Sequence, residues 1–143
     1  KKKEGKFLDA LILGKYNKFF KPNRTAKDWI SSDDSNVDEY IADPLCGYIV
    51  TNGLWQDLAN GMSNVFQQEG YKHADKSMPI FIISGSDDPV GENGNGVKRL
   101  HNYLKNIFTN VSISIIPNAR HEVFSEIDKD KNYRLLKMFI GGC

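Results

Sequence analysis

The chain has 143 residues and a formal net charge of +1, with 40% hydrophobic and 26% charged residues. These values are typical of one globular domain, give no electrostatic basis for nucleic-acid binding, and leave no apolar run near the roughly 20 residues that span a bilayer. No signal-peptide pattern follows the basic start, and we expect the two cysteines, Cys46 and Cys143, to be free thiols. We therefore expect a cytoplasmic protein.

The first half of the chain is predicted to be helical. We expect helices over residues 6–20, 26–32, 37–42 and 51–70. Pro22 ends the first of these helices, and Asn36 is a candidate cap for the third. Thr51 stands near the start of the last helix and Gly70 just past its end.

The second half alternates between strands and helices. We expect strands over 79–84 and 111–116, each followed by a helix, over 97–108 and 129–140. The first strand is a continuous apolar run, which is typical of a strand buried on both faces. Because strand and helix alternate, the predicted class is α/β with a parallel sheet and right-handed crossovers.

Two strands alone do not make a covered parallel sheet. Such sheets normally contain more strands, and an apolar strand edge left open is ready to pair with another strand. We therefore expect the chain to lack an N-terminal half that completes the sheet, or to pair with a second copy of itself.

An acidic and a basic residue follow the two predicted strands. Asp88 lies in the loop after the first strand, and His121 lies in the loop after the second. The functional crevice of an open α/β sheet lies beyond the carboxyl ends of its strands, so these two side chains could meet. A carboxylate bonded to one imidazole nitrogen fixes the tautomer and frees the other nitrogen to act as a base.

Two stretches resemble a known family. ISGSDDPVGENGNGVKRLHNYL and VSISIIPNARHEVFSE are similar to the last two strand-loop units of the monoacylglycerol lipase and lysophospholipase-like hydrolases, which are sometimes grouped with serine aminopeptidases. In that family a Gly-x-x-Asp loop supplies the acid of a catalytic triad, and Gly85 to Asp88 matches it. Ala119-Arg120-His121 with Glu126 matches the family's histidine loop. The order acid then histidine is that of α/β-hydrolases.

The resemblance covers nearly the whole chain. The segment from Phe20 to Gly47 is similar to the family's helical cap domain. The resemblance implies a helical cap and connecting helix over 1–70, followed over 71–143 by the C-terminal part of the hydrolase core. The implied fold is a partial α/β-hydrolase: a helical cap, then two parallel strands with flanking helices.

The resemblance also implies an activity. The intact protein would be a serine hydrolase that cleaves carboxylic esters of a lipid-like substrate, such as a monoacylglycerol or a lysophospholipid. Asp88 and His121 would be catalytic, and no metal or other cofactor would be needed. Two alternatives remain open: a peptidase or other acyl hydrolase of the same fold, and a non-catalytic binding or dimerisation module.

The family's nucleophile elbow, Gly-x-Ser-x-Gly, lies before the cap and is missing here, as is its oxyanion loop. The nearest match, Gly61-Met62-Ser63-Asn64-Val65, lacks the second glycine and follows a predicted helix where the elbow follows a strand. We therefore interpret Ser63 as an ordinary helix serine, and expect the chain alone to be inactive.

Other polar residues have simpler interpretations. Asp87, one residue from the family position, is expected to bond loop amides or water, and His73 and His101 to be solvated. Residues 128–132 copy the start of a calcium loop, but the glycine and the glutamate that such a loop needs are replaced by other residues. Residues 93–96 are expected to form a flexible turn before a helix. Aromatic residues could line the cap or form its core: Phe19, Phe20, Trp29, Tyr40 and Trp55.

Overall fold

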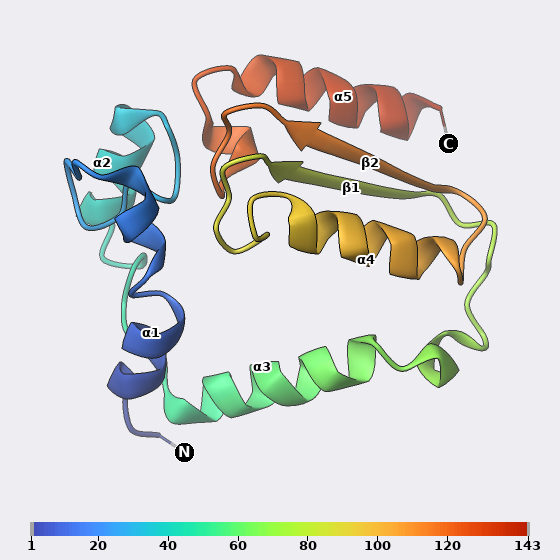
Figure 1. Ribbon diagram of the computed structural model, residues 1–143, viewed down its shortest axis with the longest axis horizontal. Helices are drawn as coiled ribbons and strands as arrows, with labels where there is room; N and C mark the ends of the chain where they lie inside the picture. Colours follow the sequence, from blue (N-terminus) through green and yellow to red (C-terminus); the bar gives the residue numbers. More distant parts are fainter. Residues whose placement is uncertain (1, 143) are drawn as a thin grey trace.

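The computed structural model describes residues 2–142, which form a helical column joined to a small parallel sheet. The helical part comprises α1 (Lys6–Ile12), a 3-10 turn at Tyr16–Phe20, α2 (Asp34–Ala42) and α3 (Asn52–Val65). Figure 1 shows α1 and α2 stacked in one column, from which α3 runs out beneath α4. The column therefore stands at one end of the sheet, and α3 leads the chain toward the other.

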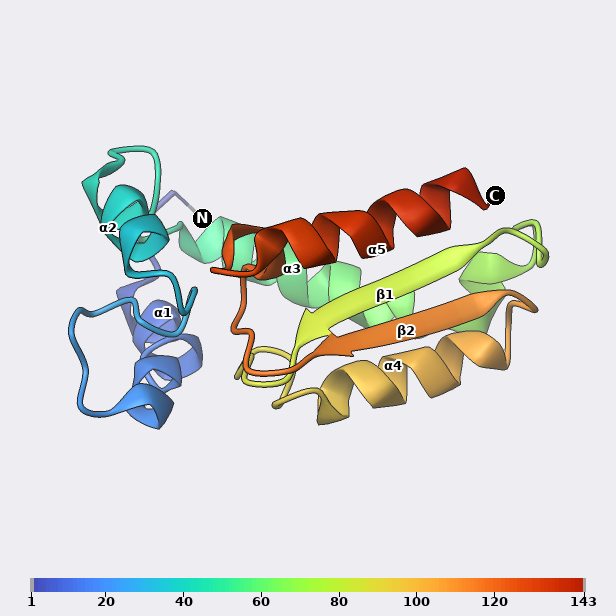
Figure 2. The same cartoon turned by 90° about the horizontal axis from the view of Figure 1, so that it is seen from above.

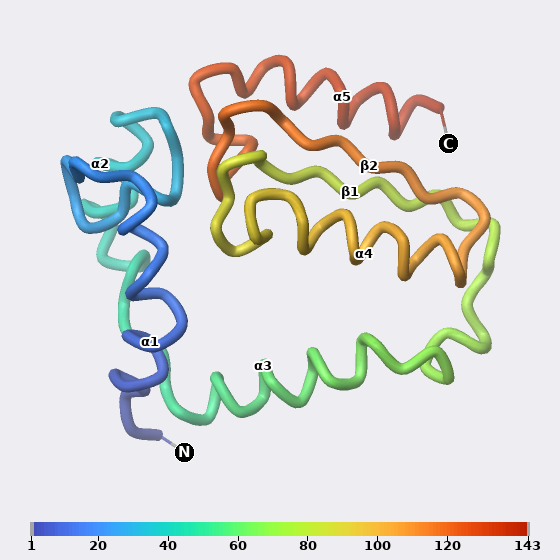
Figure 3. The backbone as a smooth tube through the Cα atoms, viewed as in Figure 1, coloured from blue at the N-terminus to red at the C-terminus, as the bar shows by residue number. Residues whose placement is uncertain are grey.

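The sheet has the parallel topology that the sequence predicts. β1 (Ile80–Gly85) pairs with β2 (Val111–Ile116), with Ile80 opposite Val111 and Gly85 opposite Ile116. Two helices cover it, α4 (Asn95–Lys105) between the strands and α5 (Lys129–Gly141) after them. Figure 2 shows these helices on opposite faces of the sheet. Both strands end near the helical column, as the backbone trace in Figure 3 also shows.

The helix expected over 26–32 is wrong, because this stretch consists of turns and bends. The side chain of Asp28 is the reason. It accepts hydrogen bonds from the backbone N–H groups of Arg24, at 2.7 Å, and Thr25, at 2.9 Å. A carboxylate that bonds nearby amides in this way offers the backbone an alternative to helical pairing.

Several helix ends also differ from expectation, including both ends of α4, which spans Asn95–Lys105 where the sequence predicts 97–108. The 6–20 stretch divides into α1 and a 3-10 turn, and α3 ends at Val65, so that Gly70 lies in a second 3-10 turn, Gln68–Tyr71. α2 begins at Asp34, and its cap is Asp33, whose side chain accepts from the N–H of Ser35. Asn36 instead donates to Glu122 at 3.0 Å, so a long-range bond replaces the expected cap. Thr51 caps α3 as expected.

Much apolar surface is left open. Along α3, Leu54, Leu58, Met62 and Val65 repeat at helical spacing, and each is 47–55% exposed. No helix among the described residues is long and apolar enough to cross a membrane. Cys46 is a free thiol, and Cys143 lies outside the described residues.

Candidate active site

Asp88 is held in a buried position by the loop after β1. Its side chain is 9% exposed, and Oδ1 accepts a hydrogen bond from the N–H of Val90 at 2.9 Å. The carbonyl of Asp88 in turn accepts from the N–H of Asn93 at 2.9 Å. The carboxylate is therefore fixed by its own loop, with oxygen lone pairs left for another donor.

His121 supplies that donor. Its Nδ1 lies 3.2 Å from each carboxylate oxygen of Asp88, although 33 residues separate the two in sequence. A carboxylate can only accept, so Nδ1 carries the proton and Nε2 of the neutral ring can accept one. The His121 side chain is 40% exposed, so the ring is partly accessible to solvent. The structure thus brings together the two side chains that the sequence singles out.

The carboxylate also changes the acidity of the histidine. The hydrogen bond that His121 donates to Asp88 raises the pKa of His121, burial lowers it, and the negative charges of Asp88 and Glu122 raise it further, with a net increase. An imidazolium formed by proton uptake is therefore stabilised at this position.

A close backbone approach makes the meeting possible. A Cβ at Gly85 would stand 2.1 Å from the carbonyl oxygen of Ala119 and 2.2 Å from that of Arg120. Only glycine allows such contact. Next to it, the N–H of Asp87 donates to the carbonyl of Ala119 at 2.9 Å, and the N–H of Ser86 to that of Ile116 at 2.8 Å. The two loops are thereby joined edge to edge.

Aromatic rings form one wall of the site. The ring centroids of Trp29 and His121 lie 5.2 Å apart, and the ring of Tyr16 is tilted against that of Trp29 at 5.3 Å. Burial and the charge of Asp88 raise the pKa of Tyr16. Trp29 is only 8% exposed, so this wall is packed before any ligand arrives.

A pocket of about 370 Å³ lies behind this wall. Trp29, Tyr40 and Trp55 line it, and Asp9 and Lys27 contribute its charged groups. Of the aromatic residues that the sequence offers for the cap, these three therefore line a cavity. Phe19 is 66% exposed, and Phe20 lies beneath the guanidinium of Arg120.

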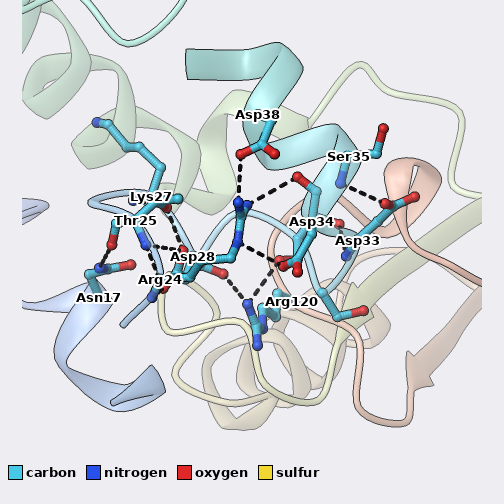
Figure 4. Close-up of polar contacts among 12 residues, drawn as sticks. Asn17, Arg24, Thr25, Lys27, Asp28, Asp33, Asp34, Ser35, Asp38 and Arg120 are labelled. Carbon is cyan, nitrogen blue, oxygen red and sulfur yellow. Dashed lines mark hydrogen bonds and ion pairs between the residues drawn. The ribbon is translucent and has the colours of Figure 1, made fainter. Parts of the chain in front are cut away.

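Sequence reasoning missed the connection between the histidine loop and the segment around Asp28. Figure 4 shows Arg120 beside Asp28, to whose backbone carbonyl its guanidinium donates a hydrogen bond. One signal was available: Thr25 and Asp28 have the Ser/Thr-x-x-acid spacing of a capping box. Asp28 does accept from the N–H of Thr25, but no helix follows.

The remaining candidates lie elsewhere. Asp87 is exposed and accepts from the hydroxyl of Ser86 at 2.8 Å. Ser63 lies on α3 and donates to the carbonyl of Asn60 at 2.8 Å, as an ordinary helix serine does. His73 is exposed in a turn. His101 is half-buried, with Nε2 3.4 Å from the carbonyl of Val111, so it is only partly exposed to solvent.

Two loops resemble ligand-binding loops in sequence, residues 128–132 and 93–96. Over residues 2–142, no group of three or more metal-ligating side chains comes together. In the copy of a calcium loop, Asp128 pairs with Lys131 at 2.7 Å. Residues 93–96 lead from a turn into α4, with Gly94 at φ 81° as its cap.

Comparison with known families shows to which family this chain belongs. The profile described as "Serine aminopeptidase, S33" matches residues 2–128, most of the chain. The chain belongs to the serine aminopeptidase family. A search of curated proteins found no match. The family match confirms the resemblance inferred from the two loops.

Solved structures agree with the family. A thermostable carboxyl esterase from Bacillus coagulans, in complex with glycerol, is 28% identical with a TM-score of 0.77, over 96% of this chain and 45% of that one. A lipase in an open form is 24% identical, with a TM-score of 0.73 over 93% and 44%. A monoacylglycerol lipase from Paleococcus ferrophilus is 19% identical, with a TM-score of 0.67 over 99% and 54%.

These likenesses establish the fold of this serine aminopeptidase family member. The chain spans about half the length of the solved structures that it matches. It therefore has a partial α/β-hydrolase fold, in agreement with the sequence prediction and with the two-stranded sheet.

Proposed function

We propose that this chain supplies the acid and the base of a serine hydrolase that cleaves carboxylic esters. The observation that carries the proposal is the bond between His121 Nδ1 and Asp88, with the His121 side chain 40% exposed. Membership of a hydrolase family and 28% identity to a carboxyl esterase support it.

The mechanism follows from the tautomer that Asp88 imposes. Nε2 of His121 takes the proton of a serine hydroxyl as the serine oxygen bonds to the ester carbonyl carbon. The imidazolium then gives that proton to the departing alkoxide oxygen as its bond to the acyl carbon breaks. Water repeats the cycle: its oxygen bonds to the acyl carbon as His121 accepts its proton. His121 then gives that proton to the serine oxygen as the acyl–serine bond breaks, which releases the acid. Asp88 stabilises the imidazolium in both halves.

The nucleophile lies outside this chain under the proposal. Ser63 donates its hydroxyl to a helix carbonyl, and it lacks the strand-to-helix turn on which a nucleophile elbow depends. Upstream sequence would have to supply the serine and the oxyanion donors, because a second copy of this chain lacks both and could only pair at the sheet edge. The chain alone would then be inactive, since the serine and the oxyanion donors are both missing.

The substrate class we propose is a lipid-like ester, such as a monoacylglycerol or lysophospholipid, held by residues 1–70 acting as a cap. The support is the pocket of about 370 Å³ behind Trp29, whose lining is largely aromatic and aliphatic. Such lining suits an acyl chain, because apolar burial is favourable and non-directional.

One observation favours a second candidate. Asp9 contributes a carboxylate to that same pocket, and the family takes its name from aminopeptidases. A carboxylate could pair with the free α-amino group of a peptide, and the same acid and base would then serve amide hydrolysis.

The test uses the longest natural chain that carries this segment. We would assay p-nitrophenyl esters of increasing acyl length beside aminoacyl p-nitroanilides, in the wild type, Asp88→Asn and His121→Ala. We expect ester turnover to fall by at least a thousandfold in both variants, in line with the loss of triad members elsewhere. Asp87→Asn is the matched control and should keep nearly full activity. Turnover retained by His121→Ala would overturn the proposal, and preference for the anilides would favour the peptidase.

A further inference from the structure

The loop that carries His121 is bonded to a segment far away in the sequence. Segment 28–32 lies against residues 119–126, which we call the histidine loop. Two bonds join the loop to this segment: the N–H of Glu122 donates to the carbonyl of Ile30 at 2.8 Å, and Ser31 Oγ donates to the carbonyl of Ser125 at 2.9 Å. About 90 residues separate the two partners of each bond, so these are tertiary contacts.

Glu126 is a buried charged residue of this contact. It is 3% exposed, yet its carboxylate is well supplied with donors. Oε1 accepts from the N–H of Arg120 at 2.6 Å, while Oε2 accepts from the N–H of Ser32 at 3.0 Å and from the Ser32 hydroxyl. A buried carboxylate is tolerated only when it is bonded in this way, so it strongly favours the geometry that supplies the donors.

Arg120 makes the second connection. Its guanidinium Nη1 donates to the carbonyl of Ser31 at 2.9 Å and to that of Asp28. The plane of the guanidinium lies over the ring of Phe20, with Cζ 4.3 Å from the ring centre. Its backbone N–H is at the same time the donor to Glu126. Arg120 is therefore fixed at both its main chain and its side chain.

His121 stands between these anchored residues. Arg120 precedes it and Glu122 follows it, and both have backbone N–H groups bonded as described above. Trp29, from segment 28–32, packs its ring 5.2 Å from the imidazole. The main chain on both sides of the histidine is thus bonded, to Glu126 before it and to Ile30 after it, while Trp29 of segment 28–32 covers one face of the ring.

We propose that Arg120 and Glu126 are positioning residues, which hold His121 against Asp88 by fixing the histidine loop to segment 28–32. A displacement of that segment would then carry the base with it. The catalytic meaning of this inference rests on the proposed function, whereas the geometric coupling itself does not.

The first test measures the contact between His121 and Asp88 and needs no enzymatic activity. NMR titration of the His121 ring in this chain reports its pKa, which contact with Asp88 raises above about 6.5, the ordinary value. Arg120→Met removes a nearby cation, so a purely electrostatic role would raise the pKa of His121 further. A positioning role makes the opposite prediction: the contact with Asp88 loosens, and the pKa falls toward 6.5.

Controls separate this effect from unfolding and from general charge loss. Arg99→Met removes an exposed arginine that pairs with Glu92, and should leave the titration of His121 unchanged. Ser32→Ala deletes one hydroxyl donor to Glu126 with no change of formal charge, and should lower the pKa of His121 in a chain that remains folded. A rise in Arg120→Met, or an unchanged value in a folded Ser32→Ala, would overturn the proposal.

We call the contact between segment 28–32 and the histidine loop the clamp. A second readout connects this clamp to turnover in the longest natural chain. We expect Arg120→Met to lower kcat by about ten- to a hundredfold, the size of effect that a misplacement of about 1 Å produces. KM should change little, and Arg120→Lys should recover part of kcat. Loss of activity in Asp88→Asn together with wild-type kcat in Arg120→Met would reject the positioning role while leaving the proposed function intact.

Discussion

Gly85, the last residue of β1, lies against the backbone carbonyl of Ala119, so closely that a Cβ would stand 2.1 Å from the carbonyl oxygen. This contact joins the loops that follow the two strands. Asp88 comes three residues after Gly85, and His121 comes two residues after Ala119. Their side chains can therefore reach each other at 3.2 Å. A residue without chemistry of its own therefore sets the geometry of the candidate site.

Gly85→Ala should destabilise the fold. The added methyl group meets backbone oxygen atoms, which cannot move without separating the loops, and overpacking of this kind costs about 1–3 kcal/mol or more. Urea unfolding measures the change. Gly61→Ala is the matched control, since nothing lies within 4 Å of its Cβ position on α3. That control should stabilise the chain by up to about 1 kcal/mol. Equal free energies of unfolding for the two variants would contradict the close approach.

The bond between His121 and Asp88 should make stability depend on pH. Because the folded pKa of His121 is raised, the stability that its protonated form adds is fully present below about 6.5, its unfolded pKa, and is lost as pH rises through the folded pKa. The free energy of unfolding, measured across that interval, should fall in the wild type. It should fall much less in His121→Gln, whereas His73→Gln, in an exposed turn, should behave as the wild type does. The same fall in both variants would argue against the bond.

Asn132 on α5 should support the histidine loop from the other side. It is 2% exposed, and its Nδ2 donates to the carbonyl of Val123 at 2.6 Å. Asn132→Ala leaves that carbonyl buried without its donor, at a cost of about 1–3 kcal/mol. Asn102→Ala, exposed on α4, should change stability by less than about 0.5 kcal/mol. Thermal or urea unfolding would measure both changes in stability. An Asn132→Ala variant as stable as the wild type would show that the bond to Val123 does not stabilise the fold.

The sheet could be predicted because its signals are local. Residues 111–116 form a short β-branched run, and the structure places β2 over the same range. The strand expected over 79–84 is shifted by one residue, to Ile80–Gly85. The spacing of Asp88 and His121 after parallel strands was enough to bring them together, because such loops share one edge of the sheet.

The clamp could not be predicted, because its bonds join residues about 90 positions apart and use backbone groups. Nothing in the apolar pattern of 26–32 distinguishes a helix from the turns that Asp28 stabilises. The predicted cap of α2 was wrong for a similar reason: the side chain of Asn36 bonds to Glu122, far away in the sequence, and does not cap the helix. Local propensity is overruled where a side chain finds a distant donor or acceptor.

We propose that the catalytic acid and base lie in this chain and that the nucleophile lies outside it. One experiment tests this directly. The 143-residue chain would be incubated with a fluorophosphonate probe and its intact mass measured, beside the longest natural chain that contains it. We expect no adduct on the short chain, and one adduct, upstream of this segment, on the longer chain. A single adduct on the short chain, at Ser63 above all, would show that the short chain holds its own active serine and would overturn the proposed function.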